Sequence, residues 1–131
     1  MTNHSASNID LSLTQQNYVE CISDAEAHHG HAHISALAEQ LGVSKPSVVQ
    51  MIARLVELDM VKRHDAEVLL TDAGQKVAKE LGSRHALLRD FMVEQLGMPP
   101  KIAETEACRI EHAASPVFVR ALRSFRDELK D

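Results

Sequence analysis

The chain has 131 residues, a length that fits one domain or one domain with a small extension. Hydrophobic residues make up 44% of it, yet it has one Tyr, three Phe and no Trp, so the core must consist mainly of aliphatic side chains, which suits helices packed on helices. Two Cys are too few for a disulfide framework. The net charge of -5 does not match the basic balance of most nucleic-acid binders, so any DNA binding needs a local basic patch.

Nothing near the N-terminus indicates export or membrane insertion. Residues 1–12 lack the basic start and apolar centre of a secretory signal, and no apolar run approaches the roughly 20 residues that span a bilayer. Because this segment is polar and rich in Ser and Asn, we predict a disordered arm over residues 1–12. The sequence predicts a cytoplasmic protein with no membrane partner.

The first predicted helix runs from Thr14 to about His28. Its apolar residues recur at helical intervals, Thr14 is the predicted N-cap, and Gly30 is the predicted stop. The helix also carries Asn17 and Glu20, whose side-chain oxygens can bind a divalent metal. Because these two residues are three positions apart, they share one face of the helix.

Histidines surround Gly30 in the sequence HHGHAH, at positions His28, His29, His31 and His33. Such a segment can bind metal, but a flexible loop does not hold ligands in a fixed geometry, and a binding site needs ligands on rigid elements. We therefore predict a polar loop here, with metal binding as the alternative.

A helix-turn-helix is predicted next. Ile34 to Leu41 forms a short helix, Gly42 permits a tight turn, and Ser44 caps a second helix that continues to about residue 58. Pro46 is tolerated in that helix because it falls in the first turn, where its missing N–H has no intrahelical partner. An ordinary helical hairpin that never meets DNA is the alternative.

The exposed side of the second helix is a candidate DNA-binding face. Hydroxyl and amine groups suit phosphates, and an amide can pair with a base edge. The predicted contacts are Ser44, Lys45, Pro46, Ser47, Gln50 and Arg54 on the helix, with Lys62 and Arg63 on the segment that follows. These residues form a small basic surface on an acidic protein, so their binding to DNA should weaken steeply as salt increases.

The remaining sequence predicts a hairpin and then helices. The runs LDMVKRH and EVLLT bracket Asp65 and Ala66 and predict a two-stranded wing. Thr71 is the predicted cap of a long, mostly helical stretch, and two amphipathic helices follow it. The predicted fold is therefore mostly α. A winged helix-turn-helix domain with a small two-stranded wing is predicted over residues 13–73, and a helical domain over residues 74–131. The last two helices of the second domain are predicted over residues 101–114 and 116–130.

The stretch EACRIEH carries three side chains that can each bind a divalent metal, Cys108, Glu111 and His112. Their spacing of i, i+3 and i+4 places them on one side of a helix. Each residue alone has an ordinary structural role, but the three together favour a metal site. Since Asn17 and Glu20 lie far away in sequence, one ion could link the two ends of the chain, and the pattern predicts a metal sensor.

From Leu13 onward these motifs resemble the iron- or manganese-dependent repressors of the diphtheria toxin repressor and manganese transport regulator family. NYVECI resembles the first-helix segment of that family, GVSKPSVVQMIARL its recognition helix, VLLTDAGQKVA its wing exit and EACRIEH its metal-binding segment. The resemblance covers nearly the whole chain. It implies a repressor of metal-uptake genes, with an N-terminal winged helix that binds DNA and following helices that dimerise.

The resemblance also implies a set of metal ligands, namely Asn17, Glu20, His85, Cys108, Glu111 and His112. Glu111 and His112 match ordinary family ligands, whereas Cys108 resembles the iron-type branch and Glu20 the manganese type. The position of Asn17 usually holds Asp or Met in the family. Arg89 stands four residues after His85, where a carboxylate is common, and this difference argues against a second metal site of the iron type.

The ligand set leaves the effector open between Fe(II) and Mn(II), because a thiolate favours later metals while Asn and Glu oxygens favour hard ions. Zn(II) would also bind this set tightly in vitro. The predicted partners are a second copy of the chain and double-stranded DNA with a palindromic operator. Metal would lock the first helix against the EACRIEH segment and set the two recognition helices toward successive major grooves, about 34 Å or a multiple of it apart.

Two other classes remain open. A winged-helix regulator with the same fold could respond to oxidants or to an organic ligand through Cys108, and only metal dependence separates the two readings. A small metal-dependent enzyme could use a Cys/His/Glu site. However, the chain has no HExxH, no Gly-rich phosphate loop and no GxSxG, so we predict a regulator rather than an enzyme.

Overall fold

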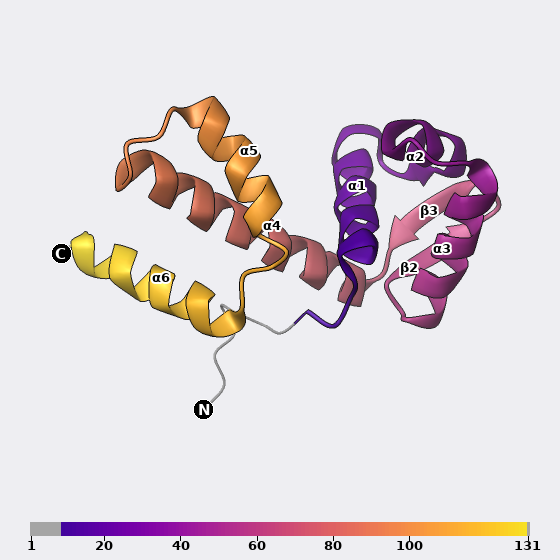
Figure 1. Ribbon diagram of the computed structural model, residues 1–131. Coiled ribbons are helices and arrows are strands. Elements are labelled where there is room, and N and C mark those ends of the chain that lie inside the picture. The colour runs from indigo at the N-terminus through magenta and orange to yellow at the C-terminus, as the bar shows by residue number, and fades with distance from the viewer. Residues whose placement is uncertain (1–8, 131) are drawn as a thin grey trace. The chain divides into compact units, whose positions relative to one another are not determined.

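The computed structural model describes residues 9–130 and is drawn in Figure 1. Residues 1–8, most of the predicted disordered arm, lie outside the described residues. The chain divides into two compact units, Leu11–Ala78 and a second that begins at Lys79, and the division falls inside the longest helix. Each unit has its own hydrophobic core.

The first unit contains helices and a small sheet, namely α1 (Leu13–His29), β1 (Ala32–His33), α2 (Ile34–Leu41), α3 (Lys45–Glu57), β2 (Val61–His64), β3 (Glu67–Leu70) and the first turns of α4 (Asp72–Glu94). The N-cap of α1 is Ser12 rather than the predicted Thr14. Ser12 Oγ accepts a hydrogen bond from Gln15 N at 3.1 Å, and Ser12 N donates to Gln15 Oε1 at 3.0 Å. This capping box satisfies two backbone donors at once, which Thr14 could not do from inside the helix. Gly30 ends α1 with φ 84°, as predicted.

The predicted wing is confirmed as the antiparallel hairpin of β2 and β3. Val61 lies opposite Leu70 at the base of the hairpin, and His64 lies opposite Glu67 next to the turn. Val61 and Leu70 are buried, whereas most of the other wing side chains are exposed. The base of the wing therefore packs against the core, and the rest of the wing exposes mostly polar side chains to solvent.

A third strand, β1, extends this sheet in the order β1-β3-β2. Ala32 pairs with Val68, His33 pairs with Glu67, and Ile34 N donates to Ala66 O at 3.0 Å. The predicted polar loop is wrong at Ala32 and His33. A strand of two residues is too short to show an alternation of apolar and polar side chains in the sequence, so only its pairing with β3 identifies it as a strand.

All elements of the first unit contribute to one core. Its fully buried side chains, at 0% exposure, are Val19, Ile22, Val48, Ile52, Leu55 and Val68. A polar link is added by Glu26 on α1, whose Oε2 accepts a hydrogen bond from Leu70 N at 2.5 Å. α1 is thus attached to β3 by apolar packing and by a charge-assisted hydrogen bond.

α2 and α3 form the predicted helix-turn-helix. Gly42 follows α2 at φ 69°, a conformation that glycine adopts without steric cost, and its N–H donates back into the last turn of α2. Ser44 then caps α3, because its Oγ accepts a hydrogen bond from Ser47 N at 3.2 Å. α3 buries Val48, Ile52 and Leu55 and leaves its opposite face exposed.

Thr71 joins the wing to α4. As predicted, it caps the helix: its Oγ1 accepts a hydrogen bond from Gly74 N at 3.0 Å. The same hydroxyl donates to Asp59 O at 2.6 Å, and Thr71 N donates to Met60 O at 2.9 Å. Gly74 packs so closely on this turn that an added Cβ would lie 2.1 Å from Met60 O. The turn before the wing and the first turn of α4 therefore touch backbone to backbone.

The second unit packs α5 (Pro100–Ile110) and α6 (Pro116–Leu129) on the rest of α4. Its core is made of Leu87, Leu88, Met92, Ala103, Ala107, Val119 and Leu122. Arg84 on α4 is 3% exposed and donates to Glu80 Oε2 at 3.0 Å and to Ala114 O at 3.1 Å. This buried guanidinium fixes the α5–α6 connection on α4.

α5 ends at Ile110, before the predicted end at residue 114. Ala113 N and Ala114 N both donate to Ile110 O, at 3.0 and 3.1 Å, so residues 111–113 form a turn. Ser115 is then extended before Pro116 and caps α6, its Oγ accepting a hydrogen bond from Phe118 N at 3.2 Å. None of the described helices is both long and apolar enough to cross a membrane.

Candidate metal centre and nucleic-acid interface

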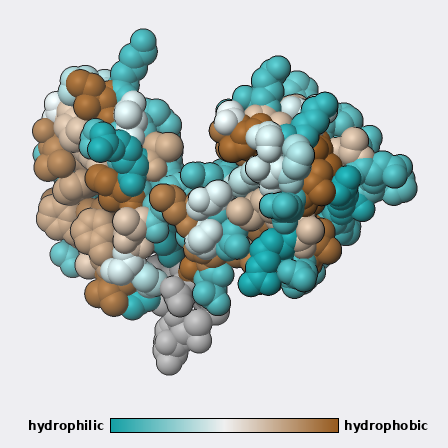
Figure 2. Space-filling model, turned by 45° about the vertical axis from the view of Figure 1, so that its right-hand side comes forward, coloured by the Kyte–Doolittle hydropathy of each residue, from teal (hydrophilic) through white to brown (hydrophobic). Residues whose placement is uncertain are grey.

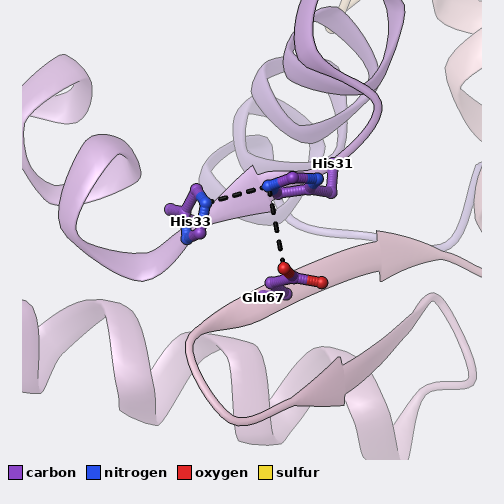
Figure 3. Close-up of side chains that lie close together, drawn as sticks. All are labelled: His31, His33 and Glu67. Carbon is purple, nitrogen blue, oxygen red and sulfur yellow. Dashed lines mark hydrogen bonds and ion pairs between the residues drawn. The ribbon is translucent and has the colours of Figure 1, made fainter.

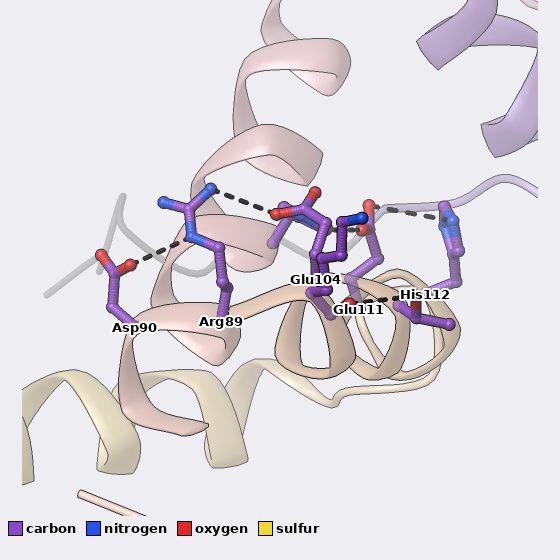
Figure 4. Close-up of polar contacts among 8 residues, drawn as sticks. Arg89, Asp90, Glu104, Glu111 and His112 are labelled. Atoms are coloured by element: carbon purple, nitrogen blue, oxygen red, sulfur yellow. Dashed lines mark hydrogen bonds and ion pairs between the residues drawn. The ribbon is translucent and has the colours of Figure 1, made fainter. Parts of the chain in front are cut away.

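Glu111 is the centre of a polar cluster in the second unit. It is the residue that follows α5, its N–H donates to Ala107 O at 2.9 Å, and its side chain is 1% exposed. Glu111 Oε1 accepts a hydrogen bond from His85 Nδ1 on α4 at 2.7 Å. His112 Nε2 lies 3.8 Å from Glu111 Oε2, and its side chain is 7% exposed. Figure 4 shows the Glu111–His112 contact after the end of α5.

Two imidazoles therefore face one buried carboxylate. Burial of a carboxylate is costly unless cations or hydrogen-bond donors surround it. The donor set of one carboxylate and two imidazoles suits Fe(II), Mn(II) and Zn(II). The described residues of this cluster fit a divalent metal ion in chemical type and in burial.

A second carboxylate, Glu104, also contacts His85 and was not among the predicted site residues. His85 Nε2 lies 2.5 Å from Glu104 Oε2, so the ring stands between the carboxylates of Glu104 and Glu111. The sequence spacing could have indicated Glu104, because it precedes Cys108 by four residues and so lies on the same face of α5. Glu104 could then serve as a ligand or as a partner that orients His85.

Arg89 occupies the other side of Glu104. Its Nη1 lies 3.6 Å from Glu104 Oε1, and its Nε donates to Asp90 Oδ1 at 3.1 Å (Figure 4). The hydrogen bond to Asp90 raises the pKa of Arg89, and the carboxylate of Glu104 raises it further, so the guanidinium keeps its charge. A fixed cation thus stands beside Glu104 and offsets part of its negative charge.

The other predicted ligands are distributed over both units. Cys108 lies on α5 and is exposed, and Asn17 and Glu20 lie on α1 in the first unit, where Asn17 is exposed and Glu20 is partly buried. Burial raises the pKa of the Cys21 thiol next to Glu20, and the carboxylates of Asp24 and Glu20 raise it further. Cys21 therefore stays protonated at neutral pH, and the metal-binding groups that α1 offers at this point are oxygens.

The predicted DNA-binding residues share an exposed face of the helix-turn-helix. Lys45 and Gln50 are exposed on α3, opposite the buried side chains that attach the helix to the core. Ser44 is engaged as the cap, and its Oγ lies 2.9 Å from Ser47 Oγ. Pro46 presents its ring in the first turn. The start of α3 is thus a polar surface whose first turn is capped by Ser44.

Two predicted basic contacts have intramolecular partners. Arg54 Nη1 donates to Glu57 Oε1 at 3.2 Å, an exposed pair that offsets part of its charge. Arg63 Nε on β2 donates to Asp65 O at 2.7 Å, which leaves its guanidinium beside the wing turn. Lys62, also on β2, is exposed. The basic surface is therefore concentrated at Lys45 and at the wing.

Apolar side chains gather on the surface of the second unit. Brown and tan surface covers much of its visible face, in the left half of Figure 2. The exposed large hydrophobic residues of this unit are Leu96, Ile102, Ile110, Val117, Phe118, Phe125 and Leu129. Such a patch is typical of a protein–protein interface.

Comparison with known families accounts for both units. Residues 10–67 match the iron dependent repressor, N-terminal DNA binding domain, and residues 71–131 match the iron dependent repressor, metal binding and dimerisation domain. The two matches together cover most of the chain.

Individual relatives agree with these matches. The transcriptional regulator MntR of Escherichia coli is 37% identical over 109 residues, which cover 82% of this chain and 70% of the relative. The iron-dependent repressor IdeR of Mycobacterium tuberculosis is 32% identical over 115 residues, 86% of this chain and 50% of the relative.

A manganese-dependent transcriptional repressor solved in complex with manganese superposes with a TM-score of 0.74 at 31% identity, covering 84% of this chain. The chain spans 51% of the length of that solved structure, about half. The chain therefore belongs to the iron-dependent repressor family of metal-dependent DNA-binding regulators.

Proposed function

We propose that this protein represses metal-uptake genes when Fe(II) or Mn(II) binds to it. The observation that carries the proposal is Glu111, a carboxylate at 1% exposure that contacts His85 and faces His112. Such a cluster at the end of α5, in the unit that matches a metal binding and dimerisation domain, supports a metal site. The basic surface of the other unit supports the DNA partner.

The proposed ligands are His85, Cys108, Glu111 and His112 from the second unit and Asn17 and Glu20 from α1. A bound ion would supply positive charge and a fixed coordination geometry. Glu111 and Glu104 hold the His85 ring from both nitrogens, so its position is already set by α4 and α5. The Asn17 and Glu20 oxygens extend from one face of α1, so they would hold that helix once they share an ion with the second unit.

The proposed partners are a second copy of the chain and double-stranded DNA. The apolar residues of the second unit, among them Phe118 and Phe125 at 47% exposure each, would lie in the contact between copies. A twofold dimer presents two α3 helices, and a palindromic operator matches that symmetry. Because the proposed partner is DNA, we also propose that the protein acts in the cytoplasm.

Fluorescence anisotropy tests the proposal directly. The purified chain is titrated onto DNA from upstream of its own gene, at fixed salt, with Fe(II) under anaerobic conditions, Mn(II), Zn(II) or no metal. We expect Fe(II) or Mn(II) to tighten binding about 5- to 150-fold, the usual range for coupling between two sites. Binding that is equal with and without every metal would reject metal activation.

Lys45→Ala and Gln50→Ala should separate phosphate contact from base contact. Lys45 is exposed at the start of α3, and a phosphate contact is independent of sequence, so its loss should weaken operator and random DNA alike. The slope of log affinity against log salt should fall by about 1. Gln50→Ala should instead change which operator sequences are preferred, as measured by competition with single-base variants. Lys101→Ala, exposed on α5, is the matched control, and an unchanged response to both α3 variants would reject this face.

Cys108 should be protected from alkylation when the metal site is filled. Cys108 is exposed, whereas Cys21 is half-buried and has a raised pKa, so iodoacetamide should modify Cys108 first at neutral pH. Saturating Zn(II) or Fe(II) should slow the reaction at Cys108 and leave Cys21 unaffected, as followed by mass spectrometry. Equal alkylation rates with and without metal would exclude the thiolate from the site.

Cys108→Glu should shift the metal selectivity of DNA binding toward Mn(II), because a carboxylate replaces a soft ligand.

A further inference from the structure

Three metal-binding side chains converge at the edge of the wing, away from the cluster around Glu111. His31 precedes β1, His33 ends it, and Glu67 begins β3 (Figure 3). One potential ligand atom from each residue lies within 4.8 Å of the other two. His31 Nε2 is 2.8 Å from His33 Nε2 and 3.8 Å from Glu67 Oε2.

The pleat of the sheet brings these residues together. His33 and Glu67 are direct antiparallel partners, and directly paired residues point to the same face. His31 precedes His33 by two residues, so the extended chain directs both rings to that face. Ile34 N donates to Ala66 O at 3.0 Å, which fixes β1 beside the wing turn. His33 and Glu67 therefore lie on a hydrogen-bonded ladder, and His31 is two residues before His33. The ladder gives the site the rigid support that a loop would not provide.

The distances are close to those of a filled site. Nitrogen ligands about 2.0–2.1 Å from a tetrahedral zinc ion lie about 3.3 Å from each other. The observed separations of 2.8 Å and 3.8 Å bracket this value. In the His31–His33 hydrogen bond one Nε2 donates and the other accepts. If the donating ring shifts its proton to Nδ1, its other neutral tautomer, both Nε2 lone pairs can bind an ion.

We propose that His31, His33 and Glu67 form a second metal site, which binds Zn(II) or another late first-row divalent ion with water completing the coordination. Two imidazoles and one carboxylate favour these ions over Mg(II) or Ca(II), which prefer oxygen ligands. The side chains of His31 and Glu67 are 33% and 47% exposed, so an ion can reach them from solvent. None of these three residues belongs to the Glu111 cluster, so the site does not depend on the proposed function of that cluster.

An ion here would join the strand that follows α1 to the wing. The ladder between β1 and β3 has two residue pairs, so a metal ion would add a further link between these strands. It would also place positive charge at the end of β3 that pairs with β2, where Glu67 lies opposite His64 and Arg63 is the next residue along β2. The ion would stiffen the wing and increase its charge.

Zinc stoichiometry on the full chain tests the site. Isothermal titration with Zn(II) and absorption spectroscopy with Co(II) are carried out on the Glu111→Gln background, so that the cluster at the end of α5 is impaired in every sample. His31→Gln/His33→Gln and, separately, Glu67→Gln are compared with the control His28→Ala/His29→Ala. The control histidines belong to the same HHGHAH sequence but lie in the last turn of α1, where His28 Nδ1 contacts Asp24 O at 2.8 Å.

The His31/His33 variant should lose one equivalent of zinc and the corresponding Co(II) absorption bands, while the control keeps both. Glu67→Gln should weaken binding at least 10-fold, because it removes a charged ligand without changing shape. Circular dichroism checks that each variant is folded. Equal zinc stoichiometry in the His31/His33 variant and the control would overturn the site, and it would do so whatever the fate of metal-dependent DNA binding.

Discussion

Glu111→Gln should abolish the stimulation of DNA binding by metal and leave the chain folded. The substitution preserves shape and removes the negative charge at a position that is 1% exposed and contacts His85 at 2.7 Å. An amide is a much weaker ligand than a carboxylate, so metal affinity should fall by about 10-fold or more. Anisotropy with operator DNA should lose the whole metal-dependent gain, about 5- to 150-fold.

Glu106→Gln is the matched control for this prediction. Glu106 lies on α5, five residues before Glu111, and its side chain is 39% exposed. Its Oε2 lies 3.8 Å from Nη1 of the exposed Arg109. The control should keep its metal response and its thermal unfolding temperature. If Glu111→Gln responds to Fe(II) or Mn(II) as the unaltered chain does, the buried carboxylate is not a ligand and the proposed centre is wrong.

Gly74→Ala should destabilise the first unit by about 3 kcal/mol, the upper end of typical overpacking costs. The new Cβ would lie 2.1 Å from Met60 O, a backbone atom that cannot rotate away. The backbone would have to move, and the hydrogen bond from Thr71 N to Met60 O would weaken. Urea unfolding followed by far-UV circular dichroism measures the loss.

Gly82→Ala serves as the opposite control in the same helix. An added Cβ at Gly82 meets nothing within 4 Å, and the residue is exposed. Alanine in a helix interior is favoured over glycine by about 0.5–1 kcal/mol, so this variant should be more stable than the unaltered chain. Equal effects of the two substitutions would show that the close contact at Met60 is not present in solution.

The helical part of the fold is largely readable from the sequence because its signals are local. Gly30 ends α1, Ser44 caps α3 and Thr71 caps α4, each through a contact within four residues. The wing is readable for the same reason, since β2 and β3 are adjacent in the chain and meet at a short turn. Local rules fail where two local solutions compete, as at Ser12 and Thr14.

What the sequence does not predict depends on partners distant in the chain. β1 is a strand only because Ala32 and His33 meet β3, more than 30 positions later. Glu104 gains its role from His85, which lies 19 residues earlier on another helix. The spacing of Cys108, Glu111 and His112 predicts one face of a helix, but α5 ends at Ile110. Glu111 and His112 therefore lie in the turn that follows α5, where His112 Nε2 is 3.8 Å from Glu111 Oε2. Whether all six predicted ligands share one ion stays a prediction.

The hydrogen bond from Leu70 N to Glu26, together with the short ladder between β1 and β3, gives α1 two separate mechanical connections to the wing. A displacement of α1 along its axis would pull on both ends of β3 at once, without first passing through α3. The wing and α1, the helix that carries Asn17 and Glu20, would then move together as one rigid group. An ion that restrains this helix would therefore also restrain the wing, and with it the contacts that we propose between the wing and the DNA backbone.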